Sequence, residues 1–262
     1  MTDTAGWVGY VAGFHSQRAG ITEDVLERAR DDAGRTPYDW AAEPVRPGLC
    51  VLDLACGSAP MHARLRARSY IGLDLSAAEL AVAASRRVPV AFANASRLPV
   101  ADGSVDAVVM SMALMLVPLP TTLHEVKRVL RPGGVFVATF PASRPMPPAD
   151  WLRYARLCLA LRHPSLIYPN GRALSDVRGL IASAGLTLVS DDARAFACDV
   201  STGHLADQLF RSLYLPDVEP RRMDAGRQVV RGWAGSTITT PIRRVVAATP
   251  AGSRRDAARR SG

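Results

Sequence analysis

The spacing of hydrophobic residues along the chain changes near residue 49. Residues 1–45 have a helical pattern, in which Thr22 is followed by two acidic residues that suit the first turn of a helix. Beyond residue 49, short apolar runs alternate with longer amphipathic stretches, as strands alternate with helices. The apolar runs predict strands at residues 50–55, 70–74, 88–93, 105–112 and 135–140.

The segments between these runs predict helices with recognisable boundaries. One helix is expected over residues 60–68, and one begins at the capping box Ser76-Ala-Ala-Glu79. Another runs from Thr121 until Pro132 prevents its continuation. A further helix is expected at residues 175–184, and two further strands are expected at residues 186–198 and 238–248.

Strict alternation of strand and helix predicts parallel strands joined by right-handed crossovers. We therefore expect an α/β fold: a Rossmann-like, seven-stranded, mostly parallel sheet with an antiparallel last strand, helices on both faces and helical lid insertions. The expected organisation is one domain over residues 1–250, followed by a disordered basic tail over residues 251–262. Within the domain we expect a helical N-terminal cap (residues 1–45) and two lid insertions (residues 142–172 and 200–236).

The formal net charge of +8 is concentrated at the C-terminal end of the chain. Ten arginines and only two aspartates follow residue 220, so the rest of the chain is close to neutral. A solvated basic tail explains this distribution better than a nucleic-acid footprint, and we do not expect a nucleic-acid partner.

Other features of composition point to a cytoplasmic protein. No apolar stretch reaches the roughly 18 to 20 residues of a membrane span, and the start lacks the pattern of a signal peptide. Four cysteines without C-x-x-C spacing indicate reduced thiols. We expect no membrane partner and no metal, and the oligomeric state stays open.

The segment from Asp53 to Pro60 begins at the end of the first predicted strand of the sheet and continues into the turn, where ligands of open parallel sheets bind. Asp74 closes the next strand 21 residues later, at the distance where an acid meets ribose hydroxyls in nucleotide-binding units. Gly57 is the only glycine of this loop, so the glycine turn that holds a pyrophosphate is absent. The pattern predicts a site for a nucleoside without phosphates.

Four motifs within residues 50–141 resemble those of the class I S-adenosylmethionine-dependent methyltransferases, particularly the small-molecule branch similar to methyltransferase type 11. Residues 51–59 (Val-Leu-Asp-Leu-Ala-Cys-Gly-Ser-Ala) are similar to the first motif of that family, V-L-D-x-G-C-G-x-G. Residues 71–76 match the second motif and residues 94–108 the third. Residues 125–134 correspond to the segment before the fifth strand of the family.

The resemblance implies S-adenosylmethionine as cofactor and assigns its binding residues. The first motif would line the methionine part, Asp74 would accept from the ribose hydroxyls, and Leu75 would pack on the adenine. Two alanines, Ala55 and Ala59, replace the first and third glycines of the family, and Asn94 replaces the acid that meets the adenine amino group. The implied cofactor-binding set is Asp53, Ala55, Cys56, Gly57, Asp74, Leu75, Asn94, Ala95, Ser111 and Met112.

The sequence predicts the methyl acceptor less directly than the cofactor. Apolar residues at helical spacing in both lid insertions indicate a small, largely apolar acceptor, methylated by in-line displacement. The catalytic residues are unknown; His15, His163 and His204 lie in the cap and the lids and are candidate bases, whereas Tyr10, Arg18 and Tyr38 are candidates to close over the cofactor. Two alternatives stay open: a methyltransferase acting on RNA or protein, and a methyltransferase-like protein that binds without transferring methyl.

Overall fold

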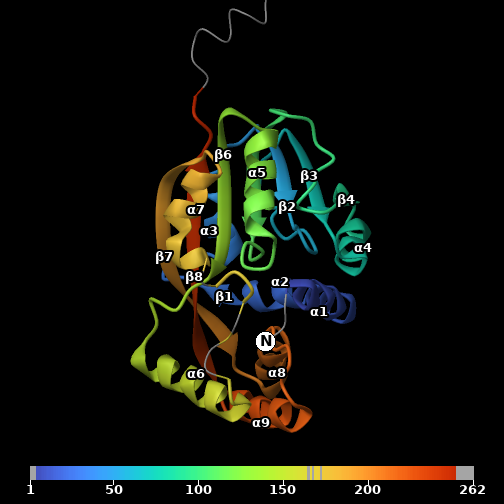
Figure 1. Ribbon diagram of the computed structural model, residues 1–262. Helices are drawn as coiled ribbons and strands as arrows, with labels where there is room; N and C mark the ends of the chain where they lie inside the picture. The colour runs from blue at the N-terminus through green and yellow to red at the C-terminus, as the bar shows by residue number, and fades with distance from the viewer. Residues whose placement is uncertain (1–3, 164–165, 167, 172, 252–262) are drawn as a thin grey trace, which may run out of the picture.

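One sheet of eight strands forms the centre of the protein (Figure 1). The computed structural model describes residues 4–163, 166, 168–171 and 173–251. Across the sheet the strand order is β1-β7-β8-β6-β5-β2-β3-β4. The strands are β1 (Ala29–Arg30), β2 (Cys50–Leu54), β3 (Ser69–Asp74), β4 (Val90–Phe92), β5 (Val105–Ser111), β6 (Leu130–Pro141), β7 (Thr187–Val200) and β8 (Ser236–Ala248).

The predicted fold class is confirmed. Strands β2 to β6 pair in parallel, and β8, the last strand in the chain, runs antiparallel to both β6 and β7. The eighth strand, β1, was not predicted, because it lies in the segment expected to be helical. Its two residues pair antiparallel with Ala197 and Cys198 of β7. Ala29 is fully buried there, so tertiary burial outweighs local helix preference at this point.

Helices cover both faces of the sheet, with α5 and α7 on one face and α3 on the other (Figure 1). Alternate residues of each strand serve two separate cores: Leu52 and Val108 point to one, whereas Val51 and Val109 point to the other. The helices are α1 (Thr4–Gln17), α2 (Ile21–Leu26), α3 (Pro37–Ala42), α4 (Ala77–Ser85), α5 (Leu119–Val129), α6 (Pro148–Leu161), α7 (Val177–Ser183), α8 (Gly203–Arg211) and α9 (Pro220–Arg231).

The helix predicted over residues 60–68 is wrong. The backbone there makes only isolated turns, such as Leu65 N–H to the Met61 carbonyl, before entering β3. The Arg64 guanidinium binds the Pro60 carbonyl and the carboxylates of Glu27 and Asp39. So short a segment makes a marginal helix, and these long-range contacts determine its path instead.

Strands β7 and β8 extend beyond the rest of the sheet and carry a second layer of helices. β6 pairs with β8 only from Ile242 to Ala248, whereas β7 continues to pair with β8 down to Ser236. The extension runs toward α6, α8 and α9, which lie together below the sheet (Figure 1). These three helices come from the two segments predicted as lid insertions.

The basic segment predicted at residues 251–262 lies, apart from residue 251, outside the described residues. Within the described part of the chain, no helix has the length and apolar character required to cross a membrane. The described residues also contain no cluster of three or more His, Cys, Asp or Glu side chains suited to a metal ion.

Candidate active site

A cavity of about 350 Å³ lies at the carboxyl ends of β2, β3 and β5, and we call it the loop cavity. It brings together nine of the ten residues expected to bind the cofactor, although they come from four separate segments. Helices α1 and α2 close it from below through residues such as His15 and Thr22. The nine residues are Ala55, Cys56, Gly57, Asp74, Leu75, Asn94, Ala95, Ser111 and Met112.

Asp53, the tenth residue, does not line the cavity but lies behind it. Only 1% of it is exposed, and its Oδ2 accepts a hydrogen bond of 2.7 Å from the Tyr70 hydroxyl. Its Oδ1 is buried and has no hydrogen-bond partner among the described residues. Burial raises the pKa of Asp53 to about 7, against a smaller lowering by the Tyr70 hydrogen bond, and the nearby Asp74 carboxylate raises it further.

Asp74 fixes the loop and faces the cavity. Its Oδ2 accepts from the Gly57 N–H at 2.8 Å, and its Oδ1 accepts from the Ser76 N–H at 2.7 Å. Burial raises the pKa of Asp74, and the two backbone hydrogen bonds oppose that rise. Each carboxylate oxygen keeps a second lone pair, so Asp74 can still accept from two hydroxyl groups of a ligand.

The loop after β2 takes a backbone shape that favours glycine. Ala55, Gly57 and Ala59 have φ angles of 54°, 54° and 61°, all in the left-handed region. Each alanine in this region costs about 1 kcal/mol relative to a right-handed conformation. The positions at which the related family has glycine are therefore positions of real backbone strain in this chain.

The rim of the loop cavity offers an apolar surface beside polar backbone. Leu75 is 46% exposed, although its side chain is large and apolar. Asn94 follows β4, and its Oδ1 accepts from the Ser96 N–H at 2.8 Å. The Asn94 oxygen expected to read an adenine edge is thus already engaged once, with one lone pair left for a ligand.

The charge of the loop cavity selects among nucleoside ligands. Its lining contains the carboxylates of Glu23, Asp74 and Glu79 but, among the described residues, no lysine or arginine. A phosphate group would meet only negative charge at this site. A nucleoside that carries positive charge is the complementary ligand.

Glu79 makes hydrogen bonds that the sequence did not predict. Ser76 caps α4 by accepting from the Glu79 N–H at 3.3 Å, but the Glu79 carboxylate does not complete the capping box. Instead, its Oε1 lies 2.7 Å from Nδ1 of His15, and its Oε2 accepts from the Gly20 N–H at 2.9 Å. The side chain therefore ties the N-terminal helices to α4 across the cavity.

His15 connects Glu79 to Tyr214, which follows α8. Nε2 of His15 lies 2.9 Å from the Tyr214 hydroxyl. A carboxylate only accepts, so the Nδ1–H of His15 donates to Glu79, and in this tautomer Nε2 is free to accept from the Tyr214 hydroxyl. Burial raises the pKa of Tyr214, which keeps its hydroxyl protonated at neutral pH.

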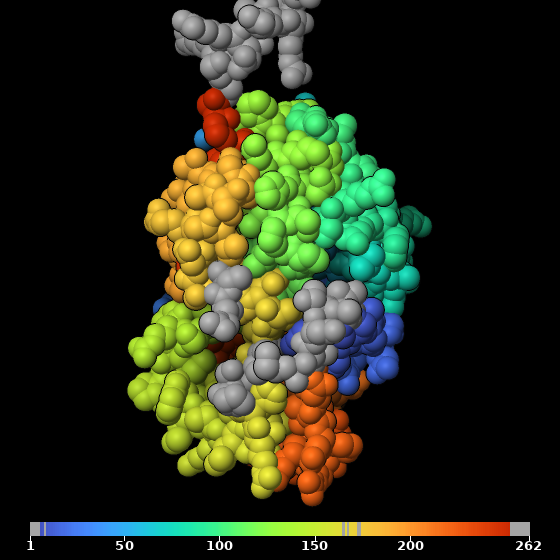
Figure 2. Space-filling model, in the orientation of Figure 1, coloured from blue at the N-terminus to red at the C-terminus, as the bar shows by residue number. Residues whose placement is uncertain are grey.

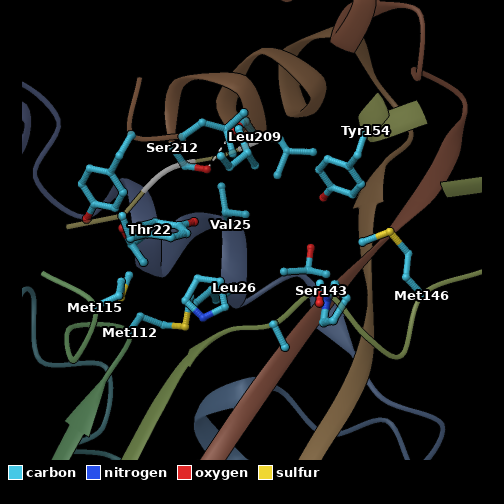
Figure 3. A pocket seen from close by; sticks show the side chains of 18 of the residues that line it. Thr22, Val25, Leu26, Met112, Met115, Ser143, Met146, Tyr154, Leu209 and Ser212 are labelled. Carbon is cyan, nitrogen blue, oxygen red and sulfur yellow. Dashed lines mark hydrogen bonds between the residues drawn. The ribbon is translucent and has the colours of Figure 1, made fainter. Parts of the chain in front are cut away.

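A second cavity, which we call the apolar cavity, has a volume of about 510 Å³ (Figure 3). It lies between the end of the sheet near β5, β6 and β8 and the helices α2, α6 and α8. Its walls are mainly methionine, leucine, valine and aromatic side chains, with hydroxyl groups such as those of Ser143 and Thr240. Its lining among the described residues contains no Asp, Glu, His, Lys or Arg. Such a chamber suits a neutral, largely apolar molecule.

The two cavities share three residues, Thr22, Met112 and Tyr214. Met112 has a φ of 56°, so a residue that prefers other conformations is held in the left-handed region where the cavities meet. Its N–H donates to the Thr139 carbonyl at 2.8 Å, which stabilises that conformation. Strain maintained by surrounding contacts is a feature of functional sites.

The three candidate histidines differ in whether they line a cavity. His15 lines the loop cavity, whereas His163 and His204 line neither cavity, and His204 is exposed in the first turn of α8. Of the cap residues proposed to close over the cofactor, Tyr38 alone lines the loop cavity.

Some important residues were not identified from the sequence. Tyr214 and Thr22 carry no motif, and Glu79 was assigned only a capping role. Glu79 is only 3% exposed although it lies in the first turn of a helix, and this burial is visible in the structure but not in the sequence.

Most arginines after residue 220 pair with acids in the described part of the chain. Arg221, Arg227 and Arg231 pair with Glu219 or Asp207. Arg243 and Arg244 pair with acidic residues of other segments. This neutralisation gives no support to the RNA-directed alternative.

Comparison with known proteins finds a family match over the segment that supplies most residues of the loop cavity. Residues 52–138 match the methyltransferase domain family. A demethylmenaquinone methyltransferase of Beutenbergia cavernae is 37% identical over 155 residues, which are 57% of this chain and 62% of that protein. The match therefore spans less than two thirds of the relative's length.

Solved structures show the same fold at low sequence identity. The cyclase SpnF has a TM-score of 0.53 at 20% identity, with 82% of this chain and 81% of that chain covered. A structure from work on conversion of a disulfide bond into a thioacetal group in echinomycin biosynthesis has a TM-score of 0.55 at 16% identity, covering 86% of both chains.

Proposed function

We propose that this chain, which belongs to the class I S-adenosylmethionine-dependent methyltransferases, transfers a methyl group to a small, neutral, largely apolar acceptor. S-adenosylmethionine is the methyl donor of this family, and when bound it supplies a methyl group on a positively charged sulfur. The observation that carries the proposal is that the loop cavity, which is acidic, adjoins the uncharged apolar cavity at Thr22, Met112 and Tyr214.

The residues of the loop cavity fit this cofactor. Asp74 offers acceptors for the ribose hydroxyls, and the exposed face of Leu75 suits the adenine ring. Glu79, Glu23 and Asp74 provide the negative charge that a sulfonium and an ammonium group require. Gly57 leaves space in the loop, since a Cβ atom there would have no neighbour closer than 3.8 Å.

The acceptor is proposed from the apolar cavity. The volume of about 510 Å³ lies within the range of small-molecule sites, and the absence of charged lining residues in the described chain disfavours ionic substrates. The family match ends at residue 138, before most of the residues that line this cavity. The family match therefore does not define the acceptor. Demethylmenaquinone, which the name of the Beutenbergia cavernae relative includes, is a first probe of the acceptor class.

The arrangement of the two cavities supports in-line transfer. Thr22, Met112 and Tyr214 line both cavities, so a donor bound in one and an acceptor bound in the other would meet at these residues. Orientation of this kind contributes several kcal/mol to catalysis by itself, roughly 7 to 11 in well-oriented systems. The protein's main task is then positioning and exclusion of water.

For an acceptor that must lose a proton, we propose His15 as the base acting through Tyr214. The acceptor proton passes to the Tyr214 oxygen while the Tyr214 proton passes to Nε2 of His15. The Glu79 carboxylate, 2.7 Å from Nδ1, stabilises the resulting imidazolium. His15 is the one candidate histidine that lines either cavity, and Tyr214 lines both.

Blocking the apolar cavity tests the proposed function. Ala155 lines that cavity from α6, so Ala155→Trp is expected to lower transfer of labelled methyl to demethylmenaquinone at least tenfold, because the indole fills acceptor space. Calorimetry with S-adenosylhomocysteine should give an unchanged Kd. Ala149→Trp, at an exposed position of the same helix outside both cavities, is the matched control. If the parent protein methylates neither demethylmenaquinone nor any of a panel of neutral phenols, the proposal is wrong.

Removing the Tyr214 hydroxyl tests the proton path. Tyr214→Phe is expected to lower kcat at least tenfold with KM and the Kd of S-adenosylhomocysteine nearly unchanged, because the ring stays but the relay is cut. The rise of kcat with pH should also move to higher pH, because an acceptor without a base must ionise by itself. Tyr10→Phe is the control, since Tyr10 lines neither cavity and its hydroxyl accepts from the Leu215 N–H. A pH profile identical to that of the parent would contradict the relay.

A further inference from the structure

Helix α6 exposes large apolar side chains to solvent. Trp151, Leu152 and Leu159 are 64%, 46% and 78% exposed. The described chain has six exposed large hydrophobic residues, so half of them lie on this one helix of 14 residues. Figure 2 shows α6, in yellow-green, on the outer surface beside the orange helices α8 and α9. A gathering of this kind marks an interaction surface more often than scattered exposed residues do.

Positive charge surrounds these apolar residues. Residues 143–163 contain four arginines and a single acid, Asp150. Asp150 is buried and binds Arg153 and the Thr239 N–H. Arg156 and Arg162 are exposed on α6, and no described carboxylate forms an ion pair with either. The outward face of α6 thus combines apolar side chains with uncompensated guanidinium groups.

The same helix forms a wall of the apolar cavity. Trp151, Ala155 and Cys158 line that cavity, together with Met146 just before the helix. Trp151 is both a lining residue and mostly exposed, so it stands where the cavity opens to the surface. The exposed apolar face and the cavity mouth are therefore continuous.

We propose that α6 lies on the surface of an anionic lipid bilayer, from which an apolar acceptor enters the cavity beside Trp151. Tryptophan and leucine side chains suit the boundary between headgroups and acyl chains, and arginines among them attract anionic headgroups. The route keeps an apolar molecule out of water between bilayer and cavity. Only the purpose of docking rests on the proposed function; the docking itself does not.

A bilayer fits this face better than a second copy of the chain. Two copies meeting through α6 would bring Arg156 and Arg162 of each close to those of the other, without acids to pair with them. Like charges at a contact disfavour that contact. Anionic phosphate groups offer the complementary charge over the whole face.

Sedimentation with lipid vesicles tests the proposal on the full chain. The protein is expected to bind vesicles of equal parts phosphatidylglycerol and phosphatidylcholine at least tenfold more tightly than vesicles of phosphatidylcholine alone. The double variant Leu152→Glu/Leu159→Glu should lose at least tenfold of that binding. Val189→Glu, at a position 64% exposed on β7, should bind like the parent. Circular dichroism verifies that all three proteins are folded.

Several results would overturn docking through α6: equal binding to both kinds of vesicle, no loss in the double variant, or an equal loss in Val189→Glu. A dimer of the parent protein that the double variant converts to monomer would assign the face to a second copy instead. Methyl transfer to a detergent-solubilised acceptor is measured in parallel. Docking that fails while this transfer persists refutes the docking alone, and the reverse result refutes the proposed function alone.

Discussion

Replacing Asp74 with alanine is expected to weaken the binding of S-adenosylhomocysteine at least tenfold. The substitution removes the proposed acceptor of the ribose hydroxyls and frees the Gly57 and Ser76 N–H groups that hold the loop. Hydrogen bonds to charged groups contribute about 1.5 to 3 kcal/mol each, so the loss of even one accounts for a tenfold effect. Isothermal titration calorimetry measures the change directly.

Two further variants make the Asp74 result specific. Asp74→Asn keeps one oxygen acceptor and should lose less affinity than Asp74→Ala. Asp102→Ala removes a carboxylate whose side chain is 80% exposed and lines neither cavity, so it should bind like the parent. An Asp74→Ala protein with parental affinity would remove Asp74 from the cofactor site.

Replacing Asp53 with asparagine is expected to change how stability depends on pH. The pKa of Asp53 is about 7 in the folded chain, whereas an unfolded aspartate has a pKa of about 3.9. Between these values the unfolded chain releases a proton that the folded chain keeps, so stability falls as pH rises from about 4 to 7. Asparagine has no such proton and escapes this fall.

The free energy of unfolding of Asp53→Asn, relative to that of the parent, should therefore rise by up to about 4 kcal/mol between pH 4 and pH 8. For a chain of this size the corresponding difference in Tm is on the order of 10 °C. Thermal unfolding at a series of pH values measures it, with Asp102→Asn as the exposed control. A difference between variant and parent that stays constant with pH would show that folding does not raise the pKa of Asp53.

The Asp53 prediction also explains why one motif residue behaves differently from the others. Asp53 and Asp74 both lie at the end of a predicted strand, and the motif match places both in the cofactor-binding set. In the structure, Tyr70 covers one oxygen of Asp53 and the protein interior surrounds the other, whereas Asp74 faces the loop cavity. Strand periodicity does not distinguish these outcomes, because the side chains that cover Asp53 come from neighbouring strands.

Local patterns in the sequence predicted seven of the eight described strands, their order of appearance and the loop after β2. The apolar runs correspond to nearly continuous burial in strands such as β2 and β5, and positive φ angles at Ala55 and Ala59 coincide with glycines of the family motif. These features depend on residues close together in the chain, so the sequence alone is sufficient to predict them.

Only the tertiary structure decided how the site is completed. His15 meets Glu79 across 64 residues and Tyr214 across 199, and no local pattern encodes a contact over such separations. The extension of β7 and β8, which carries the helices of the apolar cavity, depends on pairing between distant strands. The sequence thus predicted the strand ends and the turn that form most of the loop cavity, because those features are local. The apolar cavity depended on the fold, because its walls come from segments that only packing brings together.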